Sequence, residues 1–314
     1  MNHGDTLSSI HADRIAIKQA MLACNPIWRG PKPQTWRFIR DIAFDWLMVF
    51  ASVWATHRIG WMTSPIALVV IGNRQRAIGN LLHEASHGNL STHRHTNDYL
   101  AHLLLAPPLL NSLPVYRALH ARHHAWLGDP QRDPDLLPSL TRDGDQWHDV
   151  YVRCLMRFSI FRGSLVGHFS NGKLTGRQRL GILAWWMITS LTLAAINPQF
   201  SIVFLILWFG SRITIFHAIT TFREMTDHYG LEPGSIFGFT REIPDHGPLS
   251  TLLHPHHNGY HLTHHLFPTV PYHQLPSLHK QLMRLNEFTD QAKICKAYLV
   301  GPQSSVFGWG AHHG

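Results

Sequence analysis

The chain has 314 residues, of which 15% are charged, 45% are hydrophobic and 26 are histidine. Because a soluble domain carries about 25% charged residues, this composition points away from one. The sequence also shows no low-complexity stretch, glycine period or sustained heptad, which excludes disordered, collagen-like and coiled-coil proteins. The net charge of +8 is spread between apolar blocks, which disfavours a nucleic-acid-binding protein. Three widely spaced cysteines without a CxxC motif predict no disulfide framework.

The first pair of apolar segments follows a polar to mixed stretch of 40 residues. This stretch lacks the apolar run of a signal peptide. The segments Ile42–Thr56 and Ile59–Gly72 are each shorter than the ~20 residues that a membrane-spanning helix needs. Flanking residues could extend both segments, and we therefore predict a first helical hairpin over residues 42–72.

The second pair of apolar segments is more continuous. Leu180–Ile196 and Phe200–Phe216 flank the turn 197–199, and they predict a second hairpin over residues 180–217. Between the two pairs, Tyr99–Leu110 is apolar but contains two prolines. It is too short and too broken to span a membrane, which favours an interfacial segment.

The positions of the basic residues orient the two hairpins. Of the 27 lysines and arginines, only Arg58 lies in the connecting turns, 52–64 and 197–199. Positive residues stay on the cytoplasmic side of a membrane. We therefore expect both termini and the segments 73–179 and 218–303 to be cytoplasmic, with residues 304–314 as a tail, in one all-α integral membrane domain spanning residues 1–314.

Three histidine clusters lie in the segments expected to be cytoplasmic. One has the spacing HxxxH and two have HxxHH, a string that chance would produce roughly 0.2 times in a chain of this composition. Residues three or four apart share a face of a helix, so each cluster can direct its imidazoles at one point. Imidazole suits zinc, copper, iron and nickel, and eight ligands exceed the four of one tetrahedral zinc. The pattern therefore predicts two metal ions. The eight histidines are His83, His87, His120, His123, His124, His261, His264 and His265.

Two other hypotheses are compatible with part of this pattern. His83-Glu84-x-x-His87 matches HExxH, in which two histidines bind zinc and the glutamate is the general base of a metalloprotease. That interpretation leaves both HxxHH clusters unexplained. A non-catalytic metal sensor or metal-storage protein is disfavoured because storage needs no such clustered geometry.

Three stretches around the clusters resemble a known family. They are HEASHGN (83–89), YRALHARHH (116–124) with the following DPQRDPD (129–135), and NGYHLTHHLFPTVPYHQLPSLH (258–279). From about Ile42 to His279 the chain resembles the membrane fatty acid desaturase superfamily. The resemblance implies four transmembrane helices in two hairpins under a cytoplasmic helical cap that carries a histidine-rich di-metal site. It also implies two non-haem irons and O2. The electron donor would be a separate ferredoxin, rubredoxin or cytochrome b5 type protein.

The activity that the resemblance implies is the O2-dependent introduction of a C=C bond into an acyl chain. The alternative is hydroxylation of a lipid or another hydrophobic substrate at the same site. The eight histidines would be the iron ligands. Hydrogen bonds from neighbouring groups orient such ligands, and we expect that role for Asn258 or for aspartates of the 129–135 stretch, although loop capping explains them equally well. His257 fits a supporting hydrogen-bonder better than a ligand.

A ninth histidine follows the fourth apolar segment. Members of the family often carry an extra histidine ligand here, preceded four residues earlier by an asparagine that reaches iron through water. His228 matches that histidine, whereas Glu224 replaces the asparagine. Glu224 and His228 share a helix face, and a carboxylate could bind iron directly or hold a bridging water. We therefore predict His228 as a ligand and leave the role of Glu224 open.

Overall fold

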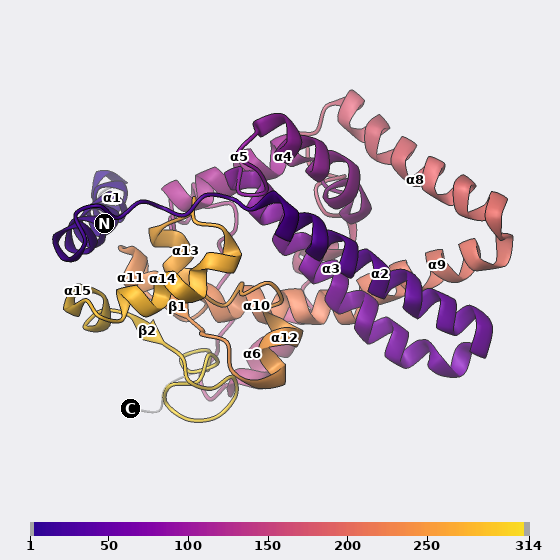
Figure 1. The fold of residues 1–314 in the computed structure, drawn as a ribbon. Helices are drawn as coiled ribbons and strands as arrows, with labels where there is room; N and C mark the ends of the chain where they lie inside the picture. The colour runs from indigo at the N-terminus through magenta and orange to yellow at the C-terminus, as the bar shows by residue number, and fades with distance from the viewer. Residues whose placement is uncertain (1–2, 311–314) are drawn as a thin grey trace. The chain divides into compact units, whose positions relative to one another are not determined.

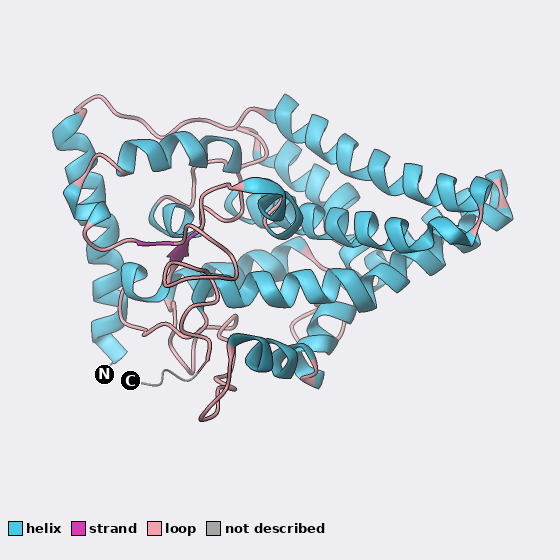
Figure 2. Ribbon diagram, turned by 90° about the horizontal axis from the view of Figure 1, so that it is seen from below, coloured by secondary structure: helices cyan, strands magenta, loops and turns pink. Residues whose placement is uncertain are grey.

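The structure, a computed structural model, describes residues 3–310 and is mostly helical, as predicted (Figure 2). The described residues contain two strands, β1 (Arg241–Glu242) and β2 (Lys293–Ile294), which pair in parallel with Arg241 opposite Lys293. The chain divides into two compact units. Unit 1 comprises Met1–Pro33, Arg117–Cys154 and Phe222–Gly314, and unit 2 comprises Gln34–Tyr116 and Leu155–Thr221.

The first hairpin of unit 2 consists of α2 (Thr35–Ile59) and α3 (Ser64–His87), joined by the short η1 (Trp61–Thr63) (Figure 1). Proline in the first turn of α3 suits a position whose backbone N–H has no partner within the helix. The helix ends at Gly88, whose φ of +80° is the left-handed conformation that closes a helix. Both helices extend beyond the predicted range 42–72, and α3 carries the first histidine cluster in its last two turns.

Buried polar pairs explain why α3 continues past its apolar run. The carboxylate of Asp45 accepts a hydrogen bond from Arg74 at 2.8 Å, and both side chains are buried. Gln75 donates to the backbone oxygen of Trp208 at 2.8 Å. Because buried polar groups need such partners, these contacts allow polar residues to lie on a buried helix.

The second hairpin of unit 2 begins with α8 (Gly176–Ile196) and continues through α9 (Pro198–Ser211) and the π-helical turn η4 (Arg212–Phe216) into α10 (His217–His228). A capping box between Thr175 and Gln178 starts α8. Asn197 caps α9 by accepting from the backbone N–H of Phe200 at 3.0 Å. Within residues 3–310, two helices, Gly176–Ile196 and Pro198–His228, are long and apolar enough to cross a membrane. Neither helix of the first hairpin is among these two, and its two membrane spans stay a prediction.

The predicted interfacial segment consists of three short helical elements, α4 (Arg94–Leu100), η2 (Ala101–Leu105) and η3 (Pro107–Leu109). A π-helical turn and a proline pair leave backbone carbonyl groups in this segment without regular helical partners. Tryptophan indoles donate to three carbonyl groups of the segment, of which that of Pro107 also accepts from the backbone N–H of Leu110 at 2.9 Å. The donor–acceptor pairs are Trp46 with Leu104 (3.1 Å), Trp185 with Leu103 (2.7 Å) and Trp186 with Pro107 (3.1 Å). The remaining helix of this unit, α7 (Phe158–Val166), precedes α8.

Unit 1 contains the N-terminal helix, the second histidine cluster and the C-terminal third of the chain. Its core includes Trp309, which is fully buried and packs on Phe222 with ring centroids 5.2 Å apart. The boundary between the units falls within α5 and α10, so the second cluster and His228 belong to unit 1. The helices that lie in it wholly or in part are α1 (His3–Cys24), α5 (Leu113–Ala125), α6 (Trp147–Leu155), α10, α11 (Ile236–Phe239), α12 (Gly247–Leu253), α13 (His261–Leu266), η5 (Tyr272–Gln274), α14 (Leu275–Leu282) and α15 (Asn286–Thr289).

Candidate metal centre

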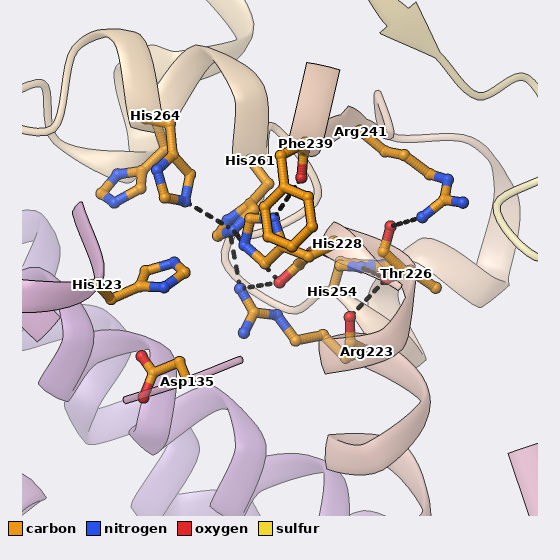
Figure 3. Close-up of polar contacts among 12 residues, drawn as sticks. His123, Asp135, Arg223, Thr226, His228, Phe239, Arg241, His254, His261 and His264 are labelled. Carbon is orange, nitrogen blue, oxygen red and sulfur yellow. Dashed lines mark hydrogen bonds and ion pairs between the residues drawn. The ribbon is translucent and has the colours of Figure 1, made fainter. Parts of the chain in front are cut away.

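Four histidines of unit 1 converge on one point and form the four-histidine group. One comes from α5, one is the last residue of α10 and two come from α13, where they are four residues apart and share a face. One ring nitrogen of each lies within 4.8 Å of the others. Figure 3 shows three of these side chains facing one another. The members are His123, His228, His261 and His265.

Two rings of this group are held by hydrogen bonds from Nδ1. His123 donates to the carboxylate of Asp133 at 2.9 Å, and His228 donates to the backbone oxygen of Phe239 at 2.7 Å. Asp133 is itself anchored, because it also accepts from the backbone N–H of Gly128 at 2.8 Å. A neutral imidazole has one N–H and one lone pair. When these rings are neutral, Nε2 therefore carries the lone pair.

The Nε2 atoms approach one another too closely for hydrogen bonding alone to explain. Nε2 of His261 lies 3.0 Å from Nε2 of His228 and 3.0 Å from Nε2 of His265. The single proton that His261 could hold there would serve only one of these contacts. Nδ1 of His265 is buried and has no hydrogen-bond partner within the described residues. A cation between the Nε2 lone pairs would satisfy them together, so this donor set fits a metal ion.

A second convergence in unit 1, the three-histidine group, combines the two HxxHH motifs. It consists of His120 and His124 from α5 and His264 from α13. Nε2 of His124 lies 2.9 Å from Nε2 of His120 and 3.1 Å from Nε2 of His264. These ring nitrogens lie close enough together to bind one metal ion, so this group fits a metal ion as well.

The first cluster lies in unit 2, at the C-terminal end of α3. His83 and His87 occupy one face of the helix, with ring centroids 5.2 Å apart. Nδ1 of His83 lies 3.4 Å from the carboxylate of Glu84. That carboxylate is buried and accepts a hydrogen bond from Asn89 at 3.1 Å. The structure thus brings these two predicted ligands together on one helix face.

Burial sets the charge state of most rings in unit 1. Burial, reinforced by neighbouring histidines, lowers the pKa of His261 and His265 well below the usual value. Burial also lowers the pKa of His120, against the opposing effect of Asp135. Burial acts in the same direction on His123, but there the hydrogen bond to Asp133 and nearby carboxylates outweigh it and raise the pKa. With these lowered pKa values, His120, His261 and His265 are neutral at pH 7, the state in which imidazole binds metals.

Glu224 belongs to neither group. Its side chain is half-buried, one helical turn before His228. On α10, the carboxylate of Asp227 lies 3.5 Å from Nε2 of His261 and 2.7 Å from Arg223. Sequence reasoning missed Asp227, although its position next to His228 was the available signal.

The other predicted supporting residues separate into two kinds. Asp133 contacts His123, a predicted ligand, whereas Asp129 caps its own turn by accepting from the backbone N–H groups of residues 131 and 132. His257, in a left-handed conformation with φ of +54°, contacts Asp245 and lies in neither group. Asn258 is buried, and its Oδ1 has no hydrogen-bond partner within the described residues.

A further anchor of α13 was not predicted. The carboxylate of Glu242, in β1, accepts from the backbone N–H of Thr263 at 2.9 Å. The same carboxylate lies 2.8 Å from Nδ1 of His279. Glu242 thereby fixes the middle of the helix that carries three of the grouped histidines.

Fold and site together define a class: a mostly helical protein whose buried imidazoles form groups able to hold metal ions. The chain belongs to the fatty acid desaturase family, whose model matches residues 59–293. It is 26% identical to dihydrorhizobitoxine desaturase of Bradyrhizobium elkanii, over 83% of this chain and 80% of that protein. It is 23% identical to a chloroplastic omega-3 fatty acid desaturase of Ricinus communis, over 76% of this chain and 58% of that protein.

Proposed function

We propose that this protein is an O2-dependent di-iron desaturase that introduces a C=C bond into an acyl chain. The observation that carries the proposal is the convergence of Nε2 atoms in the four-histidine group, where one ring nitrogen lies 3.0 Å from two others. Family membership supports desaturation over the HExxH metalloprotease hypothesis, because that motif uses only His83 and His87 of the grouped histidines.

In this proposal each histidine group holds one iron. The four-histidine group, with His228 as the ninth histidine of the centre, holds one. The three-histidine group holds the other, and His83 and His87 of the first histidine cluster are proposed as further iron ligands. Two redox-active irons held there would activate O2, which is the oxidant that accepts the two hydrogens. The balanced reaction joins R–CH2–CH2–R′, O2, two electrons and two protons to give R–CH=CH–R′ and two waters.

The residues around the groups orient the ligands and exclude water. Asp133 and the backbone oxygen of Phe239 keep the Nδ1 protons of His123 and His228 in place, which directs Nε2 at the centre. Grouped histidines from both HxxHH motifs are buried, and burial keeps solvent away from a reactive centre. Glu242 fixes the position of α13 through its hydrogen bond from the backbone N–H of Thr263. None of these side chains needs to exchange a proton for these roles.

We further propose an integral membrane protein with four spanning helices, both termini and the metal centre on the cytoplasmic side. The apolar helices Gly176–Ile196 and Pro198–His228, the family, and the near absence of basic residues from the connecting turns support this topology. A single cysteine at position 198, in a background without Cys24, Cys154 and Cys295, tests it. Labelling from the non-cytoplasmic side is expected, and labelling from the cytoplasmic side would contradict the topology.

The proposed substrate and product are tested by mass spectrometry on cells that express the wild type or His123→Ala. Because one relative is named for a fatty acid and the other for dihydrorhizobitoxine, both lipids and water-soluble metabolites are profiled. We expect a product that has lost two hydrogens and disappears in the variant. A product that has gained one oxygen would establish the hydroxylase alternative instead. Adding back candidate ferredoxin, rubredoxin or cytochrome b5 proteins in membranes identifies the electron donor.

A further inference from the structure

The N-terminal helix α1 lies outside the residues that the family model matches, yet it is built into unit 1. Ile10, Ile17 and Met21, at helical spacing, are buried on one face. On the same side Asp13 accepts from the backbone N–H of Ile236 at 2.7 Å, which caps the first turn of α11. Apolar burial and this cap fix the helix in one position.

Arg14, next to Asp13, extends from α1 to two of the grouped histidines. Its Nε donates to the backbone oxygen of His265 at 2.9 Å. Its Nη2 donates to the backbone oxygen of His124 at 3.4 Å and lies 3.3 Å from Nδ1 of the same ring. His265 belongs to the four-histidine group and His124 to the three-histidine group. One guanidinium therefore ties a member of each group to the same helix.

Arg14 is positively charged, whereas the usual partner of a metal-binding histidine is a carboxylate or a carbonyl oxygen. A carboxylate or carbonyl oxygen behind the ring makes the ligand more basic, as Asp133 and Phe239 do behind His123 and His228. The guanidinium behind His124 withdraws electron density and stabilises the metal ion in its reduced, less positive state relative to its oxidised state.

We propose that Arg14 is a positioning residue of the metal centre, which joins the backbones of His124 and His265 and raises the reduction potential of the metal ion in the three-histidine group. This inference rests on the proposed di-iron function. It gives α1 a defined part in the chemistry of the site. The proposed ligands of unit 1 all lie more than a hundred positions after Arg14 in the sequence.

The test uses full-length, iron-loaded protein with the variants Arg14→Gln and Arg14→Lys. Lys18→Gln is the matched control, because it removes the same charge from an exposed position of the same helix. Two quantities are measured: the rate of iron transfer to a chelator and the reduction potential by spectroelectrochemistry. A merely structural role would leave the potential unchanged.

We expect Arg14→Gln to shift the potential to a more negative value, because the positive charge beside His124 is lost. We also expect the variant to release iron to the chelator faster, because the loss of the tie between the two backbones outweighs the gain in basicity of His124. Arg14→Lys keeps the charge and should keep the potential, but it loses the planar fork and should release iron faster. Lys18→Gln should match the wild type. If Arg14→Gln does not fold, Arg14→Lys decides, because wild-type iron retention in that variant would overturn the positioning role.

Arg14→Gln with the iron retention and potential of Lys18→Gln would also overturn the inference. A wild type that binds no pair of irons would instead overturn the proposed function on which it rests.

Discussion

The two histidine groups of unit 1 both draw members from the same two HxxHH motifs, but their surroundings differ. In the four-histidine group, oxygen acceptors lie behind His123 and His228 at 2.9 and 2.7 Å. In the three-histidine group, the nearest carboxylate behind His120 is that of Asp135, which is 3.9 Å away and has a side chain that is 51% exposed. Behind His124 lies the guanidinium of Arg14 instead.

The same two HxxHH motifs therefore contribute to two histidine groups with unequal surroundings. Acceptors behind a ring strengthen its lone pair, whereas a positive charge weakens it. The four-histidine group has such acceptors behind two of its rings. We therefore expect it to bind its iron more tightly than the three-histidine group does. The following predictions test this inequality.

The largest effect is expected for His261→Ala. His261 is the ring whose Nε2 lies 3.0 Å from two other Nε2 atoms, so its loss removes the middle of the four-histidine group. We expect the iron of this group to be lost and turnover to be abolished, as measured by elemental analysis and product formation. His148→Ala, at an exposed histidine, is the control. Two irons in the His261 variant would contradict the ligand assignment.

His87→Ala tests the proposed contribution of the first cluster. We expect iron to fall from two per chain to about one, because the four-histidine group keeps its own ligands. Spectroscopy of the remaining iron should match that of the four-histidine group. The control is His102→Ala, at an exposed histidine of the same unit. Full iron content in the His87 variant would remove this residue from the centre.

Asp133→Asn and Asp135→Asn compare the two supporting carboxylates directly. Asp133 is buried and 2.9 Å from His123, whereas Asp135 is half-exposed and 3.9 Å from His120. Loss of such a partner costs roughly 10- to 100-fold in metal affinity, and we expect that cost for Asp133→Asn. The competition assay with a chelator should show a smaller loss for Asp135→Asn. An equal loss would contradict the inequality between the groups.

The smallest effect is expected for His257→Ala. This ring contacts Asp245 and belongs to neither group. Both irons and the normal rate of turnover should therefore be retained. Loss of an iron would show that His257 is a ligand in spite of its position.

Local patterns predicted the helical class and the histidine clusters, because hydropathy and spacing are properties of short segments. They did not predict the full length of α3. Its polar residues can be buried because they pair with distant residues, as Arg74 does with Asp45, 29 positions earlier. The same limit applies to the acidic stretch 129–135. Only the folded chain separates Asp133, which contacts His123, from Asp129, which caps a turn.

Residues that act on the site from a distance carried no recognisable motif. Arg14 reaches His124 across 110 positions and His265 across 251. Glu242 reaches Thr263 across 21 positions. Helical spacing and the family resemblance singled out Glu224, four positions before His228, and left Asp227 unconsidered. In the structure Asp227 is the one that approaches His261.

The central claim is that the two histidine groups hold two irons. Elemental analysis of purified, catalytically active protein, combined with Mössbauer spectroscopy, measures both the number and the equivalence of the metal ions. We predict two irons per chain in two distinct environments, as unequal groups require. One zinc and no iron in active protein would contradict the claim and would restore the HExxH metalloprotease hypothesis.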